Sequence, residues 1–172
     1  LTKSRYLKHF TNEEHPYGEN AIVAIMCYSG YNVEDAVIVN EGSLKRGLFS
    51  TTYYNAYEDR EESSSISNQK IDSTFMNIEE NNVLNIREGY DYSKLDKTTG
   101  LIKENVMLNE KTIVIGKATN SLIEPDMFVD ASVKCKKGQT GLVDKSFVTE
   151  GEEGQRIAKI RVRAMRIPQI GD

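Results

Sequence analysis

The sequence has few of the residues that mark particular protein classes: no tryptophan, three prolines, two histidines and two cysteines among 172 residues. Its longest apolar runs fall far below the roughly 18 residues that a membrane helix needs, and its start carries no apolar secretory signal. Cys27 and Cys135 lie far apart without CxxC spacing, so we expect reduced thiols in a reducing, intracellular compartment rather than a zinc site. The sequence begins without methionine, as an internal piece of a longer protein would.

The signatures of common enzyme classes are also missing. The sequence holds no GxxxxGK[ST] phosphate loop, no GxGxxG after a strand, no GxSxG elbow and no HExxH. His15 beside Pro16 is typical of a loop residue rather than a base, and Cys135 between two lysines is better explained as an inward-facing strand residue. The net charge of −4 argues against a protein that coats nucleic acid generally.

What is present favours a mainly β fold with short helices, in the β-rich α+β class. Short runs of Val and Ile at residues 21–28 and 35–39 predict buried strands. Asn40 and Gly47 predict the N-cap and the end of a short helix between them. Residues 48–57 then return to the Thr- and Tyr-rich composition of strands.

The second half of the chain predicts a polar stretch followed by clear strands. Residues 61–100 are polar with weak periodicity, which predicts a loop-rich insertion with a few short elements and a mobile tip. A short strand is predicted at 110–117, and two or three strands joined by glycine-bearing turns at 130–168. The last strand alternates between two faces. Its apolar face comprises Ala158, Ile160, Val162 and Ala164, and its basic face comprises Lys159, Arg161 and Arg163.

An acidic turn, "SGYNVED" at residues 29–35, separates the two apolar runs. Its adjacent carboxylates, Glu34 and Asp35, would point to opposite faces of an extended strand, so only one could enter a pocket unless the turn twists them. A carboxylate at the end of a buried strand costs several kcal/mol unless a cation or hydrogen-bond donors meet it. Turn geometry, a lysine or a hard metal ion such as Mg²⁺ could each do so. The residues alone indicate a β-rich globular domain with an acidic turn.

Several segments carry a more specific signal: "GENAIVAIMCYSGYNVEDAVIVNEGSLKRGLFSTTYY", "YSKLDKTTGLI", "KTIVIGKAT", "GLVDKSFVT" and "KIRVRAMRIPQIGD". In this order they resemble the second-largest subunit (the β subunit in bacteria) of multisubunit DNA-dependent RNA polymerases. The residues of these segments are closer to the eukaryotic, archaeal and large-DNA-virus branch of the family than to the bacterial one. Residues 61–82 match the pattern least.

The resemblance implies a division of the chain and a place for the acidic turn. Residues 1–50 would belong to the hybrid-binding β-barrel region, residues 51–167 to an inserted β-rich wall (flap) domain, and residues 168–172 to the return into the hybrid-binding region. Glu34 and Asp35 would lie at the catalytic centre, opposite the triphosphate of the incoming nucleotide. They would act on the second Mg²⁺ there, largely through water or the metal itself.

The function that the resemblance implies is template-directed nucleotidyl transfer by a multisubunit polymerase, with this chain inactive alone. Implied partners are the largest subunit and other polymerase subunits, template DNA, the RNA–DNA hybrid and nucleoside triphosphates, with no membrane. The location would be the nucleus, or the cytoplasm or virion of a large DNA virus. The alternative is a non-catalytic β-rich wall-type module that binds a transcription factor or a polymerase subunit.

Two further expectations depend on the resemblance. Lys159, Arg161 and Arg163 could contact phosphates of the hybrid, although a solvated face or pairing with acids of a neighbouring subunit is the preferred interpretation. Without the rest of the polymerase around them, residues 22–26 and 37–39 would expose apolar edges.

Overall fold

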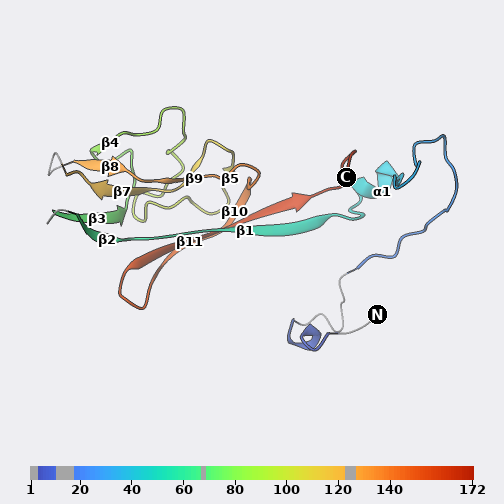
Figure 1. Cartoon of the computed structure of the whole chain (residues 1–172), viewed down its shortest axis with the longest axis horizontal. Helices are drawn as coiled ribbons and strands as arrows, with labels where there is room; N and C mark the ends of the chain where they lie inside the picture. The colour runs from blue at the N-terminus through green and yellow to red at the C-terminus, as the bar shows by residue number, and fades with distance from the viewer. Residues whose placement is uncertain (1–3, 11–17, 67–68, 123–126) are drawn as a thin grey trace. The chain divides into compact units, whose positions relative to one another are not determined.

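The computed structural model describes residues 4–10, 18–66, 69–122 and 127–172, and the chain divides into two compact units (Figure 1). We call Leu1–Thr51 with Ile167–Asp172 the terminal unit, and Thr52–Arg166 the β unit. The assignment of parts of the chain to a hybrid-binding region and a wall stays a prediction. No helix among the described residues is both long and apolar enough to cross a membrane.

The terminal unit contains two short helices, η1 (Leu7–Phe10) and α1 (Glu41–Lys45). The side chain of Asn40 caps α1 by accepting a hydrogen bond of 2.9 Å from the backbone N–H of Ser43. The chain leaves the helix through Gly47, whose φ of +107° lies in the left-handed region. The predicted helix, its cap and its end are therefore confirmed.

The predicted strands at 21–28 and 35–39 are wrong for this chain. Neither run forms a strand, and the side chains of Ile22 and Ile25 are fully exposed. The physical reason is that no described residue supplies a second strand or a covering layer for these runs. The expected exposure of residues 22–26 and 37–39 is confirmed, with Val39 half-buried.

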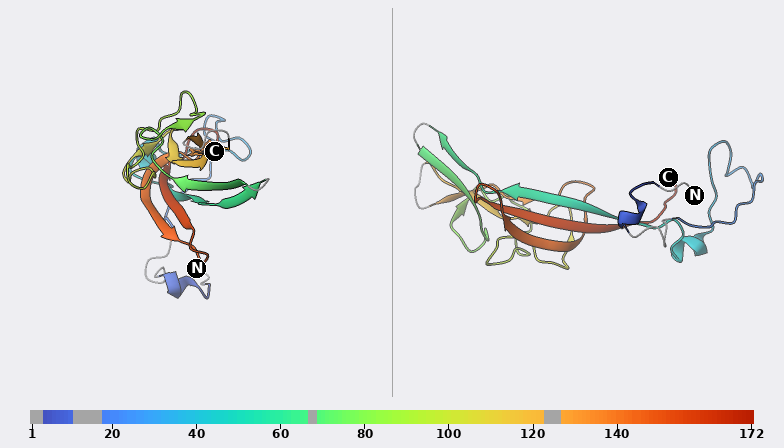
Figure 2. Two further views of the ribbon diagram at one scale, coloured as in Figure 1. Left: turned by 90° about the vertical axis from the view of Figure 1, so that its left-hand side faces the viewer. Right: turned by 90° about the horizontal axis from the view of Figure 1, so that it is seen from below.

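The first sheet of the β unit has the strand order β1-β11-β10-β5 (Figures 1 and 2). Its strands are β1 (Thr51–Arg60), β5 (Met107–Leu108), β10 (Gly141–Glu150) and β11 (Arg156–Arg166). β10 and β11 form a long antiparallel hairpin whose register is irregular only between Val143 and Lys145. The mainly β class, the two long C-terminal strands and the strand after residue 48 are thus confirmed.

The second sheet has the order β2-β3-β7-β8-β4, and β6 pairs with β9 alongside it. These strands are β2 (Ser63–Ile66), β3 (Gln69–Phe75), β4 (Val83–Leu84), β6 (Ile113–Ile115), β7 (Lys117–Asn120), β8 (Phe128–Asp130) and β9 (Val133–Lys134). The strand predicted at 110–117 exists but is shorter, because the chain breaks at Gly116 and resumes as β7.

The stretch 61–100 is loop-rich with a few short strands, as its polar composition predicts. It contains the β2–β3 hairpin, and four of its apolar residues, Phe75, Ile78, Tyr92 and Leu95, are buried in the core. Sparse but correctly placed apolar side chains suffice to fix a loop when each one is buried. Residues 67–68 and His15 lie outside the described residues, so the predictions of a mobile tip and of a loop at His15 stay untested.

The core of the β unit lies between these sheets and contains every buried hydrophobic residue described in the chain. The predicted alternation of β11 is confirmed, since Ala158, Ile160 and Val162 are buried. Cys135 is also buried, as predicted, whereas Cys27 is exposed. Those of the core residues with less than 2% exposure are Ile78, Leu95, Leu101, Ile102, Ile113, Val114, Ile115, Ala118, Val143, Ala158, Ile160 and Val162.

Ionic contacts connect the two sheets at the end of β1. The ammonium of Lys117 on β7 lies 3.0 Å from Asp59 Oδ1 and donates to the carbonyl of Arg60 at 2.8 Å. The carboxylate of Glu61 accepts from Arg156 Nε at 3.0 Å and from the backbone N–H of Phe75 at 2.8 Å. The Lys117–Asp59 pair is largely shielded from water, whereas Arg156 is partly exposed, and together the two contacts connect β1 and β11 to the second sheet.

Candidate functional site

The acidic turn begins with a tight reversal at Tyr28–Tyr31, closed by a 3.2 Å hydrogen bond from Tyr31 N–H to the carbonyl of Tyr28. Its two central residues, Ser29 and Gly30, have φ values of +54° and +73°. Positive φ at both central positions is the mark of a type I′ turn. The glycine suits this conformation, while Ser29 adopts it against its steric preference.

Asn32 fixes this reversal with its side chain. Its Oδ1 accepts from the backbone N–H of Tyr28 at 3.0 Å, and its Nδ2 donates to the carbonyl of Met26 at 2.6 Å. One amide therefore satisfies a donor and an acceptor on the incoming chain. No functional role was predicted for Asn32 from the sequence, although an Asn side chain in a turn is known to hydrogen-bond nearby backbone groups in this way.

The carboxylates stand in a second turn rather than at the start of a strand. Ala36 N–H donates to the carbonyl of Val33 at 3.3 Å, which places Glu34 and Asp35 at the two central positions. Glu34 has a φ of +58°, a left-handed conformation that costs about 1–2 kcal/mol for a residue with a side chain. The alternation argument, which assumed an extended strand at residues 34 and 35, therefore does not apply here.

Both carboxylates are exposed, and within the described part of the chain neither has a hydrogen bond or an ion pair. No group of three or more His, Cys, Asp or Glu that could hold a metal occurs among the described residues. Two carboxylates on a turn fit a hard cation such as Mg²⁺ in donor chemistry, but they cannot fill its coordination shell. The turn can therefore lend charge and orientation to a metal that takes its other ligands elsewhere.

The basic face of β11 lies in the β unit, and acids of neighbouring strands accompany it. Lys159 Nζ lies 3.4 Å from Glu58 Oε2 on β1. Arg161 binds Asp144 Oδ2 on β10 through Nε at 2.6 Å and Nη2 at 2.5 Å, and its guanidinium lies over the ring of Tyr54. The structure thus shows acid pairing within the chain itself, which the sequence did not reveal because Glu58 and Asp144 are distant from β11 in sequence.

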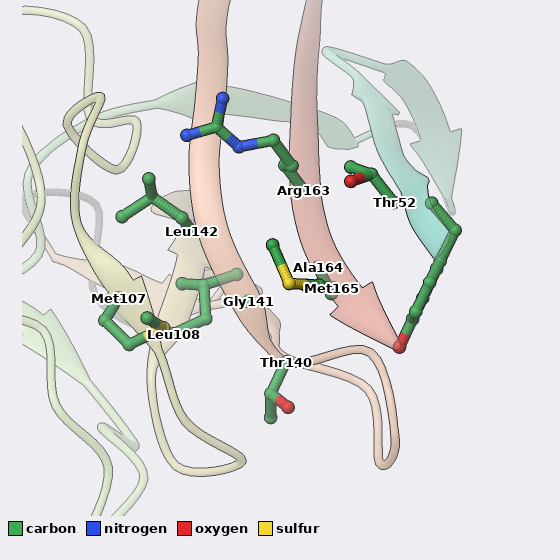
Figure 3. A pocket seen from close by; sticks show the side chains of 10 residues that line it. Thr52, Met107, Leu108, Thr140, Gly141, Leu142, Arg163, Ala164 and Met165 are labelled. Carbon is green, nitrogen blue, oxygen red and sulfur yellow. The ribbon is translucent and has the colours of Figure 1, made fainter. Parts of the chain in front are cut away.

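Arg163 differs from Lys159 and Arg161 in its environment. Its Nη1 lies 4.0 Å from Asp144 Oδ1, at the limit of an ion pair, and the carboxylate is already engaged by Arg161. Arg163 lines a hollow of 590 Å³ at the end of the first sheet (Figure 3). The hollow gave no sequence signal, because segments far apart in the chain build it. Its lining residues are Thr52, Tyr53, Met107, Leu108, Thr140, Gly141, Leu142, Arg163, Ala164 and Met165.

Comparison with known proteins gives the chain a family. The family described as RNA polymerase Rpb2, domain 6, matches residues 1–172. The chain is 37% identical to DNA-directed RNA polymerase II subunit RPB2 of Eremothecium gossypii and 31% identical to DNA-directed RNA polymerase subunit Rpo2 of Sulfolobus acidocaldarius. It is also 34% identical to a probable RPB2 homologue of Invertebrate iridescent virus 3. Each match covers all of this chain but only 14%, 16% and 14% of the relative, respectively.

Proposed function

Because this chain belongs to the RNA polymerase Rpb2, domain 6 family, we propose that its acidic turn contributes to the active centre of a DNA-directed RNA polymerase. The observation that supports this most is the pair Glu34 and Asp35, exposed on a turn that directly follows the reversal fixed by Asn32. The chain spans about 14% of the length of its Eremothecium relative, so the activity belongs to a larger assembly. The largest subunit would supply aspartates for the first Mg²⁺.

Nucleotide addition is an in-line displacement at the α-phosphate, and two bound Mg²⁺ ions neutralise charge on the attacking and leaving oxygens. Asp35, helped by Glu34, would orient the second Mg²⁺ and the triphosphate, directly or through water. Neither carboxylate needs to take or give a proton for this. Their role would be positioning and electrostatic, which is what two exposed carboxylates on a locally clamped turn can provide.

The same proposal assigns the remaining parts of the chain. Residues 1–50 and 168–172 would lie against the RNA–DNA hybrid, and residues 51–167 would form the wall that turns it. Lys159 and Arg161 would have to exchange their own acids for phosphate, so a strong nucleic-acid contact by the whole basic face is disfavoured. The assembly would work in the nucleus, or in the cytoplasm or virion if the source is a large DNA virus.

The test is the Asp35→Ala substitution in the assembled polymerase. We expect nucleotide addition to slow by about 100-fold or more, the order of magnitude for losing a preorganised electrostatic contact in an active site. Assembly and template binding should change little, because Asp35 holds no other described residue in place. The rate of single-nucleotide addition, measured across a Mg²⁺ titration, is the readout.

Glu41→Ala is the matched control, since Glu41 is an exposed carboxylate of the same unit whose ion-pair partner is Lys45 on the same helix. It should leave the rate unchanged. A normal elongation rate for Asp35→Ala at every Mg²⁺ concentration would refute the metal role.

Glu34 needs a separate design, because its backbone is strained. Glu34→Gln removes the charge and keeps the side-chain shape, while Glu34→Gly removes the side chain and relieves the left-handed conformation. We expect both to slow nucleotide addition, and less than Asp35→Ala does. Full activity in Glu34→Gly, which lacks the carboxylate, would refute a contribution of Glu34 to nucleotide addition.

A further inference from the structure

Neighbouring residues of three strands line the hollow on one face of the first sheet. Met107 on β5 is the cross-strand neighbour of Leu142 on β10, and Leu142 is the cross-strand neighbour of Arg163 on β11. Figure 3 shows the guanidinium of Arg163 extending across β10 toward the side on which Leu142 lies. The row therefore places two apolar side chains and one cation next to each other.

The lining of the hollow is largely apolar and accessible. Met107 is 63% exposed and Met165 is 67% exposed, although both are large hydrophobic residues. Methionine is flexible and polarizable, and it is common on surfaces that bind apolar side chains of a partner. A volume of 590 Å³ lies within the range of about 300–1,000 Å³ that is usual for ligand pockets in proteins.

The charge of Arg163 is the least compensated of the three basic residues proposed for nucleic acid. Asp144 gives its close contacts to Arg161, and the ion pair of Lys159 is with Glu58. The side chain of Arg163 makes no hydrogen bond among the described residues, so its guanidinium keeps its paired donors for a carboxylate or a phosphate.

The surroundings of Arg163 favour a carboxylate. Nucleic-acid sites combine several cations with aromatic platforms. Here the charge is single, its neighbours Leu142 and Met107 are aliphatic, and the half-exposed Tyr53 is the one aromatic residue of the lining. A polypeptide with an acidic residue beside a large apolar residue matches both features of the hollow, because the acid can pair with Arg163 and the apolar side chain can pack on Leu142 and Met107.

The source of that polypeptide follows from where the hollow lies along the chain. Thr52 and Met165 line it, and they stand at the two ends of the β unit, where β1 begins and β11 ends. The chain makes up only 14% of the length of its Eremothecium relative, so most of such a subunit lies outside these residues. A segment of the same polypeptide is tethered nearby and has a high effective concentration at such a site.

We propose that this hollow docks a segment of the same subunit from outside these 172 residues, with an apolar side chain between Met107 and Met165 and a carboxylate on Arg163. This inference concerns the β unit and is independent of the role proposed for Glu34 and Asp35.

The experiment replaces Met165 by a benzophenone-bearing amino acid in the complete polymerase and identifies the photo-crosslinked peptide by mass spectrometry. We expect a crosslink to a segment of the same subunit in which Asp or Glu neighbours Leu, Ile, Met or Phe. The same probe at Glu152, in the exposed turn between β10 and β11, should not give that crosslink. A crosslink from Met165 to nucleic acid or to a different subunit, or no crosslink, would overturn the proposal.

A charge exchange then tests the role of Arg163. Arg163→Glu should lower the crosslink yield at least about tenfold, and replacing the crosslinked acid by Arg should restore it. Lys145→Glu is the matched control, because Lys145 also stands exposed on the first sheet but does not line the hollow. An unchanged yield in Arg163→Glu, or an equal loss in Lys145→Glu, would contradict the specific pairing.

Discussion

Two isoleucines show how differently the two units treat the same residue type. Ile25 in the terminal unit is 100% exposed, whereas Ile160 in the β unit is 1% exposed. Both belong to segments that the sequence predicts as strands. Burying such a side chain contributes about 1.5–3 kcal/mol, so the terminal unit forgoes a stabilisation that the β unit obtains.

The difference lies in how many layers each segment needs. In β11 apolar and basic residues alternate, so one covering layer suffices and water with nearby acids serves the other face. Residues 21–26 are apolar on both faces, and a strand of that kind is stable only between two layers. The described part of the chain provides neither layer for it.

The largest expected contrast is in amide hydrogen exchange of the 172-residue chain alone. We expect residues 143–162 to exchange on the order of a thousand-fold more slowly than residues 21–39, because only the former are in hydrogen-bonded strands over a buried core. Strong protection of residues 21–39 in a monomer would break the comparison and show that the terminal unit is self-sufficient.

The ion pair between Lys117 and Asp59 tests how the β unit holds its two sheets together. Asp59→Ala should lower the free energy of unfolding by about 3 kcal/mol, because it leaves the buried ammonium with a backbone carbonyl alone. Urea denaturation followed by circular dichroism measures the change.

Two controls separate burial from charge in that experiment. The double variant Asp59→Ala with Lys117→Met should lose less stability than Asp59→Ala, because no charge is left unpaired. Glu80→Ala, which removes the exposed partner of Lys97, should have little effect. A loss of stability equal to that of Asp59→Ala in either control would mean that the buried charge is not the cause.

Alkaline pH should weaken the β unit through two buried tyrosines. Burial, reinforced by a hydrogen bond to Cys135, raises the pKa of Tyr57 to about 12, and burial with a hydrogen bond to Asp130 does the same for the pKa of Tyr92. The unfolded chain ionises its tyrosines near pH 10. The contribution of the two protonated tyrosines to the free energy of unfolding is therefore fully present below pH 10. It is lost as the pH rises toward 12, by about 2 kcal/mol for each tyrosine.

Tyr92→Phe, which keeps the ring, should remove part of this pH dependence. Denaturation midpoints measured between pH 9 and pH 12 would show it, together with the ultraviolet absorbance of tyrosinate. A midpoint that is constant over this range would show that neither hydroxyl titrates differently in the folded state.

The smallest expected effect is that of Ile25→Ala on unfolding of the isolated chain. Because the side chain is fully exposed, we expect a change within about 0.5 kcal/mol, in contrast to a core isoleucine. A loss of 2 kcal/mol or more would reveal a core in the terminal unit that the described residues do not show.

The sequence was sufficient where the signal is local or periodic. The helix capped by Asn40 and the alternation in β11 depend on a few consecutive residues, and both were predicted correctly. The strand prediction at 21–28 failed because the deciding contact is distant: the described part of the chain provides no covering layer for this run. The candidate turn was located from the sequence, but its backbone geometry at Glu34 was not.

Every hydrogen bond that shapes the acidic turn joins residues within 26–36. Within the described part of the chain, eleven consecutive residues thus fix the geometry of the carboxylates without a hydrogen bond from any other residue. We define residues 26–36 as a local cassette, and we expect its two turns to persist when it is transplanted between relatives with Asn32 intact. Replacement of Asn32 alone would break the cassette without touching either acid.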